Sequence, residues 1–177
     1  KIEKNSNDTV NIIYDVDQGD KATIDKIKFI GDKKFKDRKL RGVITSEEDK
    51  PWKFISKRIY LDIERVNLDK RLLKNFFLDK GFYQVDITDA YSQILNQKDF
   101  ELIYNINAGE KFTINKAELV LPVDYNENDF RVIKKKLAKL EGKLYSINRL
   151  NKIAKEVEYL TLRNDYEFID ASFNETV

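Results

Sequence analysis

The side chains that most often carry out catalysis are missing from this sequence of 177 residues. It contains no His and no Cys, which excludes a Ser-His-Asp triad, a thiol nucleophile and the usual zinc ligands. The carboxylates Glu47, Glu48 and Asp49 remain as acid/base or metal candidates, but no apolar sequence surrounds them to shift their pKa. We interpret them as a charged surface loop. We expect no enzyme, no metal and no cofactor.

Basic and aromatic side chains offer a second chemistry, the binding of nucleic acid or lipid. The run of three lysines at 134–136 lies between Ile133 and Leu137, which predicts the solvated face of an amphipathic helix. Lys and Arg total 33 against 31 Asp and Glu, a balance that gives little general attraction to phosphate. Phe76 and Phe77 can stack on bases, but their helical spacing favours a core. We expect no nucleic-acid partner.

The composition is that of a soluble chain with packed cores. Apolar residues make up 41% and charged residues 36%, and no stretch approaches the ~18 to 20 apolar residues of a membrane helix. The sequence begins at Lys1 and contains no Met. We therefore expect it to be part of a longer chain.

The sequence repeats itself with an offset of 90 residues, which relates Tyr14 to Tyr104 and Gly19 to Gly109. Before each Gly, apolar residues alternate with polar ones, which predicts a strand with one buried face. The alternating residues are Val10, Ile12, Tyr14 and Val16 in the first copy, and Phe100, Leu102, Tyr104 and Ile106 in the second. Each Gly then lies in a short connection where a positive φ is expected.

The same order of elements follows each Gly. A second alternating strand, a short helix, a longer helix and an aromatic-led strand are predicted, with the last strands at 82–94 and 166–177. The long helices carry apolar stripes at three- and four-residue spacing: Ile63, Val66, Leu72, Leu73, Phe76 and Phe77, then Ile147, Leu150, Ala154, Val157 and Leu160. The unit is therefore β-α-α-β-β.

Individual residues refine this pattern. Gly81 is expected to end the first long helix in a left-handed conformation, and Ser146 to cap the start of the second. Ala117 and Leu119 are placed on the first strand of the second unit. The single Trp of the chain, Trp52, follows Pro51 in a loop. It could be an exposed anchor for a partner, but we expect it to cover its own core.

Several motifs resemble the POTRA modules of the BamA family of outer-membrane β-barrel assembly factors. They are Gly19-Asp20-Lys21 and Gly109-Glu110-Lys111 between units, the strand at 24–31, Lys50-Pro51-Trp52, and Leu78-Asp79-Lys80-Gly81-Phe82. The resemblance is greatest to the third of five modules, which makes the second copy the fourth. Two departures are Asn164-Asp165-Tyr166 in place of the Gly-aromatic turn, and Val120-Leu121-Pro122 in place of a Gly.

The resemblance implies an α+β fold of tandem modules, each a three-stranded mixed sheet covered by two helices. The expected boundaries are 1–18 for the C-terminal strand of a preceding module, 19–108 for a complete module, and 109–177 for a module lacking its last strand. The second strand of each sheet is expected at an edge and the third in the centre.

The resemblance also implies partners and a location. Such modules lie in the periplasm, joined to a C-terminal barrel in the outer membrane. They bind unfolded outer-membrane proteins and BamB-like accessory lipoproteins by accepting a strand at a sheet edge. The corresponding edge strand here carries Val85, Asp86, Ile87, Thr88, Ala90, Ser92 and Ile94. A lipoprotein contact near Leu40 is also implied.

Other readings of the sequence remain open at this stage. A translocation or two-partner-secretion relative uses the same modules for different clients. A small nucleic-acid-binding tandem is an alternative of a different class, and a steep loss of affinity with salt would reveal it.

Overall fold

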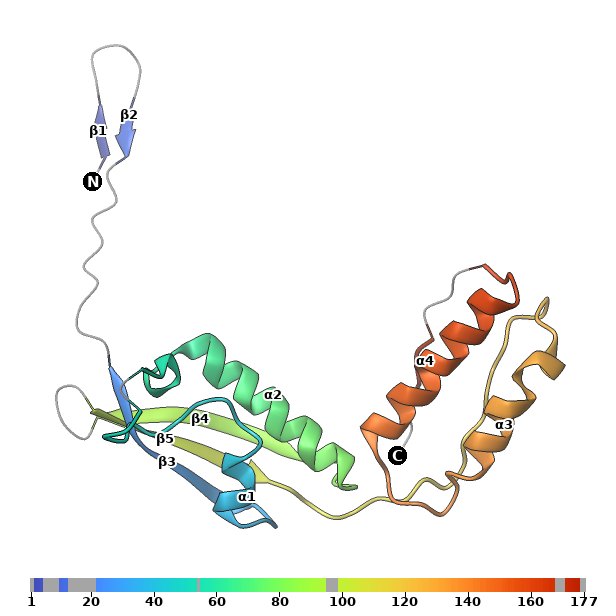
Figure 1. Ribbon diagram of the computed structural model, residues 1–177, viewed down its shortest axis with the longest axis horizontal. Helices are drawn as coiled ribbons and strands as arrows, with labels where there is room; N and C mark the ends of the chain where they lie inside the picture. The colour runs from blue at the N-terminus through green and yellow to red at the C-terminus, as the bar shows by residue number, and fades with distance from the viewer. Residues whose placement is uncertain are drawn as a thin grey trace.

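The computed structural model describes residues 2–4, 10–12, 22–53, 55–94, 99–167 and 171–175. Two modules follow one another along the chain and lie end to end (Figure 1). A short antiparallel pair, β1 (Ile2–Lys4) and β2 (Val10–Ile12), precedes them. Only Val10–Ile12 of the alternating run at 9–17 falls within the described residues, and it is a strand as predicted.

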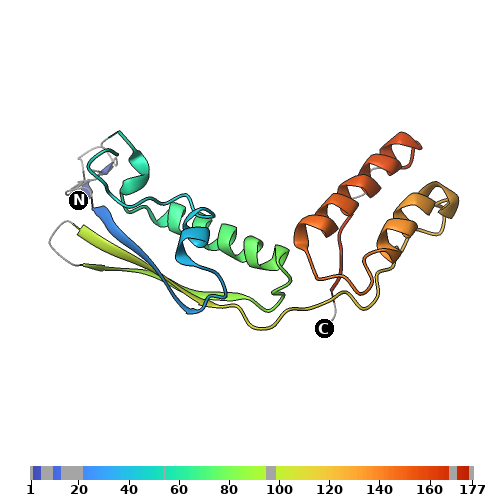
Figure 2. The same cartoon turned by 60° about the horizontal axis from the view of Figure 1, so that its bottom comes forward.

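The first module is a three-stranded mixed sheet with helices on one face (Figure 2). The strand order is β3-β5-β4, so the third strand of the unit is central and the second lies at an edge. β5 pairs in parallel with β3 and antiparallel with β4. The elements are β3 (Thr23–Asp32), α1 (Asp37–Arg41), the 3₁₀ turn η1 (Lys57–Ile59), α2 (Ile63–Asp79), β4 (Asp86–Ile94) and β5 (Asp99–Asn107).

The core of this module forms where α2 packs on the sheet. Leu73 and Phe77 of α2 are fully buried, together with Tyr104 of β5. Phe82 is buried too, so the aromatic residues at the end of α2 belong to the core, as their spacing predicts. Ile63 differs from the predicted stripe, because it is 75% exposed at the start of the helix.

A buried carboxylate completes the inner face of α2. Asp69 is fully buried and accepts hydrogen bonds from the Thr45 amide (2.6 Å), the Ser46 amide (3.1 Å) and the Tyr104 hydroxyl (2.9 Å). The Thr45 hydroxyl donates to it as well. Burial, and then the charge of Asp69, raise the pKa of Tyr104 far above its ordinary value. The network ties α2 to the loop after α1 and to the central strand.

The second module packs a short helix against a long one. It consists of the turn η2 (Glu127–Phe130), α3 (Arg131–Ala138) and α4 (Ile147–Arg163). Ile133 and Leu137 of α3 are buried, which leaves the lysines at 134–136 on the outer face as predicted. Ser146 caps α4 by accepting a hydrogen bond from the Arg149 amide.

The strands predicted for the second module are absent from the residues described there. Segments 117–121 and 171–175 have no regular structure, and one isolated bridge joins Thr113 to Leu144. The reason is visible in the first module, where β5 lies between the two outer strands and forms a ladder with each of them. Among the described residues of the second module nothing takes the place of β5, so neither segment has a ladder partner. The remainder of the predicted strand at 166–177 lies outside the described residues.

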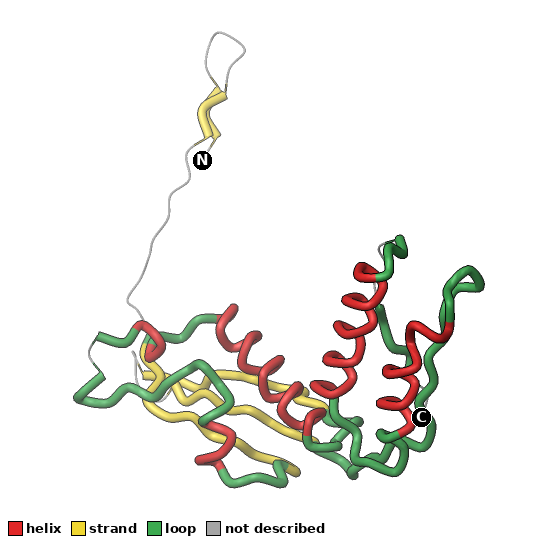
Figure 3. Tube along the Cα trace, turned by 45° about the vertical axis from the view of Figure 1, so that its right-hand side comes forward, coloured by secondary structure: helices red, strands yellow, loops and turns green. Residues whose placement is uncertain are grey.

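Direct contacts join the two modules (Figure 3). The Phe112 amide donates to the Gly81 carbonyl (2.8 Å), and the Ser146 hydroxyl donates to Asp79 at the end of α2. The rings of Tyr83 and Tyr145 meet edge to face at 5.1 Å. Gly81 has a φ of +93°, as its predicted place after the helix requires.

The sequence analysis also drew attention to Trp52 and to the turn at 164–166. Trp52 is 73% exposed, so the prediction that it covers the core is wrong. Leu40 and Val66 are members of the core cluster of this module, whereas Trp52 is not. Asp165 has a φ of +57°, so it takes the left-handed position that Gly81 occupies in the first module.

None of the helices in the described ranges has the length and apolar character needed to cross a membrane.

Replacing the buried carboxylate should destabilise the first module strongly. Asp69→Ala leaves two amides and the hydroxyls of Thr45 and Tyr104 without an acceptor, and we expect a loss of about 3 kcal/mol in the free energy of unfolding. Tyr104→Phe should cost about 1 kcal/mol, because one donor is lost. Urea unfolding followed by circular dichroism measures both. Glu64→Ala, at an exposed position of the same helix, should change stability little. If Asp69→Ala loses no more stability than Glu64→Ala, Asp69 is not the buried acceptor that holds this network together.

Candidate binding edge of the sheet

The two edges of the three-stranded sheet differ in how their backbone groups are used. β4 is paired on one side, with β5. Its backbone has no hydrogen bond to any other described residue beyond that ladder. An edge strand of this kind presents free N–H and C=O groups to a further strand. β4 is therefore the candidate binding edge.

The predicted site residues all lie on β4 or directly before it. Val85 precedes the strand, and it is buried together with Ile87. Thr88 is exposed, and Ser92 is half-buried. The remaining three are Asp86, which is exposed, Ala90, which is half-buried, and Ile94, which pairs with Phe100. Val85 and Ile87 hold the strand on the core, while the exposed side chains flank the free backbone.

A register shift divides β4 into two parts. The ladder with β5 is irregular between Ile87 and Asp89, and Thr88 has no partner in β5. From Asp89 to Ile94 the pairing is continuous. Bulges bend an edge strand and interrupt further pairing. The regular part of the edge therefore runs from Asp89 to Ile94, and exposed carboxylates lie at its N-terminal end.

The opposite edge, on β3, is capped by other groups of the same module. The Ile27 amide donates to a carboxylate oxygen of Glu48 (3.1 Å), and Arg41 donates to the Ile27 carbonyl (2.8 Å). The Asp49 amide donates to the Ile24 carbonyl (2.7 Å). Farther along the strand, the Lys33 ammonium donates to the Phe29 carbonyl. These bonds occupy the outward backbone groups that a further strand would need.

The cap on β3 is itself held by ion pairs. Arg41 lies 3.2 Å from one oxygen of Glu48, and Lys50 lies 3.2 Å from the other. Burial alone would raise the pKa of Glu48, but the Ile27 hydrogen bond and these cations outweigh it and lower the pKa. Glu48 is therefore charged at neutral pH. The carboxylates expected to form a surface loop thus include one with a structural role.

The predicted lipoprotein contact at Leu40 needs a correction. Leu40 is fully buried in the core of the first module. The apolar side of α1 faces the sheet, so its side chain is not accessible to a partner. Exposed residues of the same helix, Arg38 and Lys39, are the groups that a partner can reach there.

Sequence reasoning missed the difference between the two edges. The Glu47-Glu48-Asp49 run gave no sign of its target, because Glu48 bonds a strand 21 residues earlier. It also missed an exposed apolar pair, Trp52 and Ile55, in the loop before η1. No group of three or more potential metal-ligating side chains occurs in the part of the chain that the structure describes.

The geometry and the repeat agree with a known module family. A family model described as POTRA, surface antigen variable number repeat, matches residues 22–109. Residues 22–109 form a POTRA domain. This domain covers β3 to β5 and ends at Gly109, just before the second module begins.

Curated relatives extend the similarity beyond this POTRA domain. Outer membrane protein assembly factor BamA of Neisseria meningitidis is 23% identical over 159 residues, which is 89% of this chain and 20% of that protein. BamA of Neorickettsia risticii is 23% identical over 145 residues, which is 82% of this chain and 19% of that protein. The chain thus spans about a fifth of the length of these relatives.

A solved structure shows the same fold. The crystal structure of Haemophilus influenzae BamA POTRA3-5 superimposes with a TM-score of 0.60 at 14% sequence identity. The match covers 81% of this chain and 56% of that one. The α+β fold with a three-stranded mixed sheet and covering helices is therefore confirmed for the POTRA domain.

Removing the charge of Glu48 should weaken the POTRA domain in a pH-dependent way. Because the pKa of Glu48 is lowered on folding, its contribution is present above the ordinary value near 4.5 and is lost as the pH falls through the folded-state pKa. We expect Glu48→Gln to lose about 1 kcal/mol at pH 7 and to approach the parent chain in acid. Urea unfolding from pH 3 to 7 measures this. Glu141→Gln, at an exposed site, is the control. A loss of stability in Glu48→Gln that stays constant with pH would contradict the role of charged Glu48 in capping β3.

Proposed function

We propose that this chain is a periplasmic scaffold of an outer-membrane β-barrel assembly factor, which holds unfolded outer-membrane proteins by strand addition at β4. The observation that carries the proposal is the contrast between the two sheet edges. The β3 edge is occupied by Glu48, Arg41 and the Asp49 amide. The β4 edge has only its ladder with β5 among the described residues.

Strand addition suits clients of many sequences. Main-chain groups supply the hydrogen bonds, so affinity depends little on the side chains of the client. Strands of outer-membrane barrels alternate apolar and polar residues, which matches the two faces of β4. There Ile87 is buried and Thr88 is exposed. The aspartates at positions 86 and 89 favour clients that carry Lys or Arg near this end.

The relatives support the wider role. The matched proteins are named outer membrane protein assembly factors, and this is the basis for the periplasmic location and for a C-terminal barrel in the parent chain. Accessory lipoproteins of the BamB type are proposed as second partners. Their contact would use Ser92 and Ile94 at the edge together with the exposed side of α1.

Site-specific photo-crosslinking tests the edge directly. A photoreactive residue at Asp89 of β4 should crosslink to an extended peptide with alternating apolar residues, taken from a barrel strand. The same residue at Lys26, an exposed position of the capped strand β3, is the matched control. We expect at least tenfold more product at position 89, because the β3 edge is capped and no cap on β4 comes from the described residues.

A proline variant provides a second measurement. Ser92→Pro removes an N–H from the regular part of β4 and should lower peptide affinity at least tenfold. Its circular dichroism and urea midpoint show whether the domain is still folded. Equal crosslinking at positions 26 and 89, or a folded Ser92→Pro variant that binds the peptide unchanged, would rule out strand addition at β4.

A further inference from the structure

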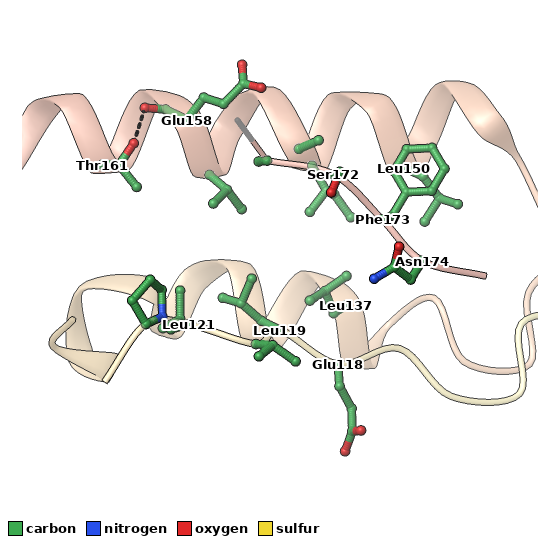
Figure 4. Close-up of a pocket in the computed structure, with 16 residues that line it drawn as sticks. Glu118, Leu119, Leu121, Leu137, Leu150, Glu158, Thr161, Ser172, Phe173 and Asn174 are labelled. Atoms are coloured by element: carbon green, nitrogen blue, oxygen red, sulfur yellow. Dashed lines mark hydrogen bonds between the residues drawn. The ribbon is translucent and has the colours of Figure 1, made fainter. Parts of the chain in front are cut away.

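The second module contains an apolar groove of about 320 Å³ between segments 117–121 and 171–175 (Figure 4). The offset of 90 relates 117–121 to residues 27–31 of β3, which pair with β5 in the first module. The groove has the place of that pairing strand, so the repeat already accounts for its apolar lining. The exposed apolar side chains in the loop before η1 have no such explanation.

Residues 50–58 form the outward part of the loop between α1 and α2, and we call them the tip. Trp52 is 73% exposed and Ile55 is 83% exposed. The indole of Trp52 has no hydrogen bond or ring contact to any other described residue. Large apolar side chains exposed close to one another are typical of protein or membrane contact sites.

Two consecutive turns shape the tip. The Lys53 amide donates to the Lys50 carbonyl (2.8 Å), and the Ser56 amide donates to the Lys53 carbonyl (2.9 Å). Trp52 lies in the first of these turns and Ile55 in the second. Because both side chains point outward from turns, the tip is a protrusion that can enter another surface.

The charged side chains of the tip are all positive. Its charged residues are Lys50, Lys53, Lys57 and Arg58. Glu47 pairs with Lys53 (2.9 Å) and Arg58 (3.5 Å), but its side chain is 28% exposed and that of Arg58 is 63% exposed. Lys57 is exposed and has no carboxylate partner among the described residues. The carboxylate lies deeper than the cations, so the outer surface of the tip is positive.

The tip is clear of the second module and of the β4 edge. Tyr60, which follows it, bridges Thr23 at the start of β3, whereas the second module follows the other end of the sheet, where Asn107 pairs with Asp32. Figure 1 and Figure 2 show this loop at the end of the first module away from the second. β5 separates β3 from β4, so a strand added at β4 leaves the tip uncovered.

The joint between the modules uses other positions. The second module meets the first through Phe112 and Ser146. Phe112 corresponds to Ala22 by the offset of 90, and Ser146 corresponds to Asp62, since both cap the start of a long helix. A module joined to the N-terminal side by the same contacts would meet Ala22 and Asp62, which lie outside the tip.

We propose that the tip is an interfacial membrane anchor for anionic phospholipids. Trp52 and Ile55 enter the boundary between headgroups and acyl chains, where Trp is favoured because its ring is apolar and its N–H is polar. Lys57 and Arg58 contact the lipid phosphates. A bilayer suits the tip better than a protein pocket, because a bilayer needs no preformed cavity and attracts charges of this one sign.

Tryptophan fluorescence tests the proposal, because Trp52 is the only Trp of the sequence. Vesicles of equal parts phosphatidylcholine and phosphatidylglycerol should shift its emission to shorter wavelength. Lipids brominated on the upper acyl chain should quench the emission, because Trp52 then lies beside them. Pure phosphatidylcholine vesicles should bind the chain about tenfold more weakly, since they carry no net charge.

Three variants that retain Trp52 separate the contributions. Ile55→Ser should weaken vesicle binding about fivefold by removing apolar area, and Lys57→Glu about fivefold or more by repelling the phosphates. Lys135→Glu makes the same charge change at an exposed position of α3 and is the matched control. It should leave binding nearly unchanged. All three positions are exposed, so circular dichroism should show an unaltered fold.

Three results would overturn the proposal. An emission that does not shift with anionic vesicles would assign the tip to a protein partner instead. A shift without quenching by the brominated lipids would mean that Trp52 stays outside the bilayer. Equal weakening by Lys57→Glu and Lys135→Glu would show that binding follows net charge and does not involve the tip.

Discussion

Every backbone N–H and C=O group of a sheet needs a hydrogen-bond partner, and this requirement determines which edge of the sheet can bind another strand. A three-stranded sheet has two edges, and each must be covered, capped or left for another strand. In the POTRA domain β3 is capped by Glu48 and Arg41, at the cost of holding two charges in a fixed geometry. β4 carries no such cap from the described residues. Under the proposed function, the sheet therefore accepts a further strand at β4 and not at β3.

The same requirement accounts for the second module. Its helices pack and its Ser146 cap forms, because these depend on side chains and on local hydrogen bonds. Strands depend on a neighbour, and segments 117–121 and 171–175 have no regular structure. Contacts such as Ser146 with Asp79 and Tyr83 with Tyr145 hold the module beside the POTRA domain even so.

Much of the architecture could be predicted from local patterns. The repeat, the apolar stripes of the long helices, the Gly81 turn and the Ser146 cap all depend on residues close in sequence. Asp69 could not be predicted, because its acceptor role is defined by Thr45, Ser46 and Tyr104 from other elements. The edge position of β4 was predicted from the resemblance to POTRA modules. The cap on β3 could not be predicted, because nothing in the spacing of Glu48 and Ile27 indicates that these two residues meet.

Amide hydrogen exchange along both edges tests the central claim most directly. In the free chain the Ile27 amide should exchange slowly, and outward amides between Asp89 and Ile94 should exchange fast. Saturation with an unfolded outer-membrane protein should slow exchange on β4 by at least tenfold and leave β3 unchanged. Protection that appears on β3, around Trp52 and Ile55, or nowhere on β4 would contradict the account.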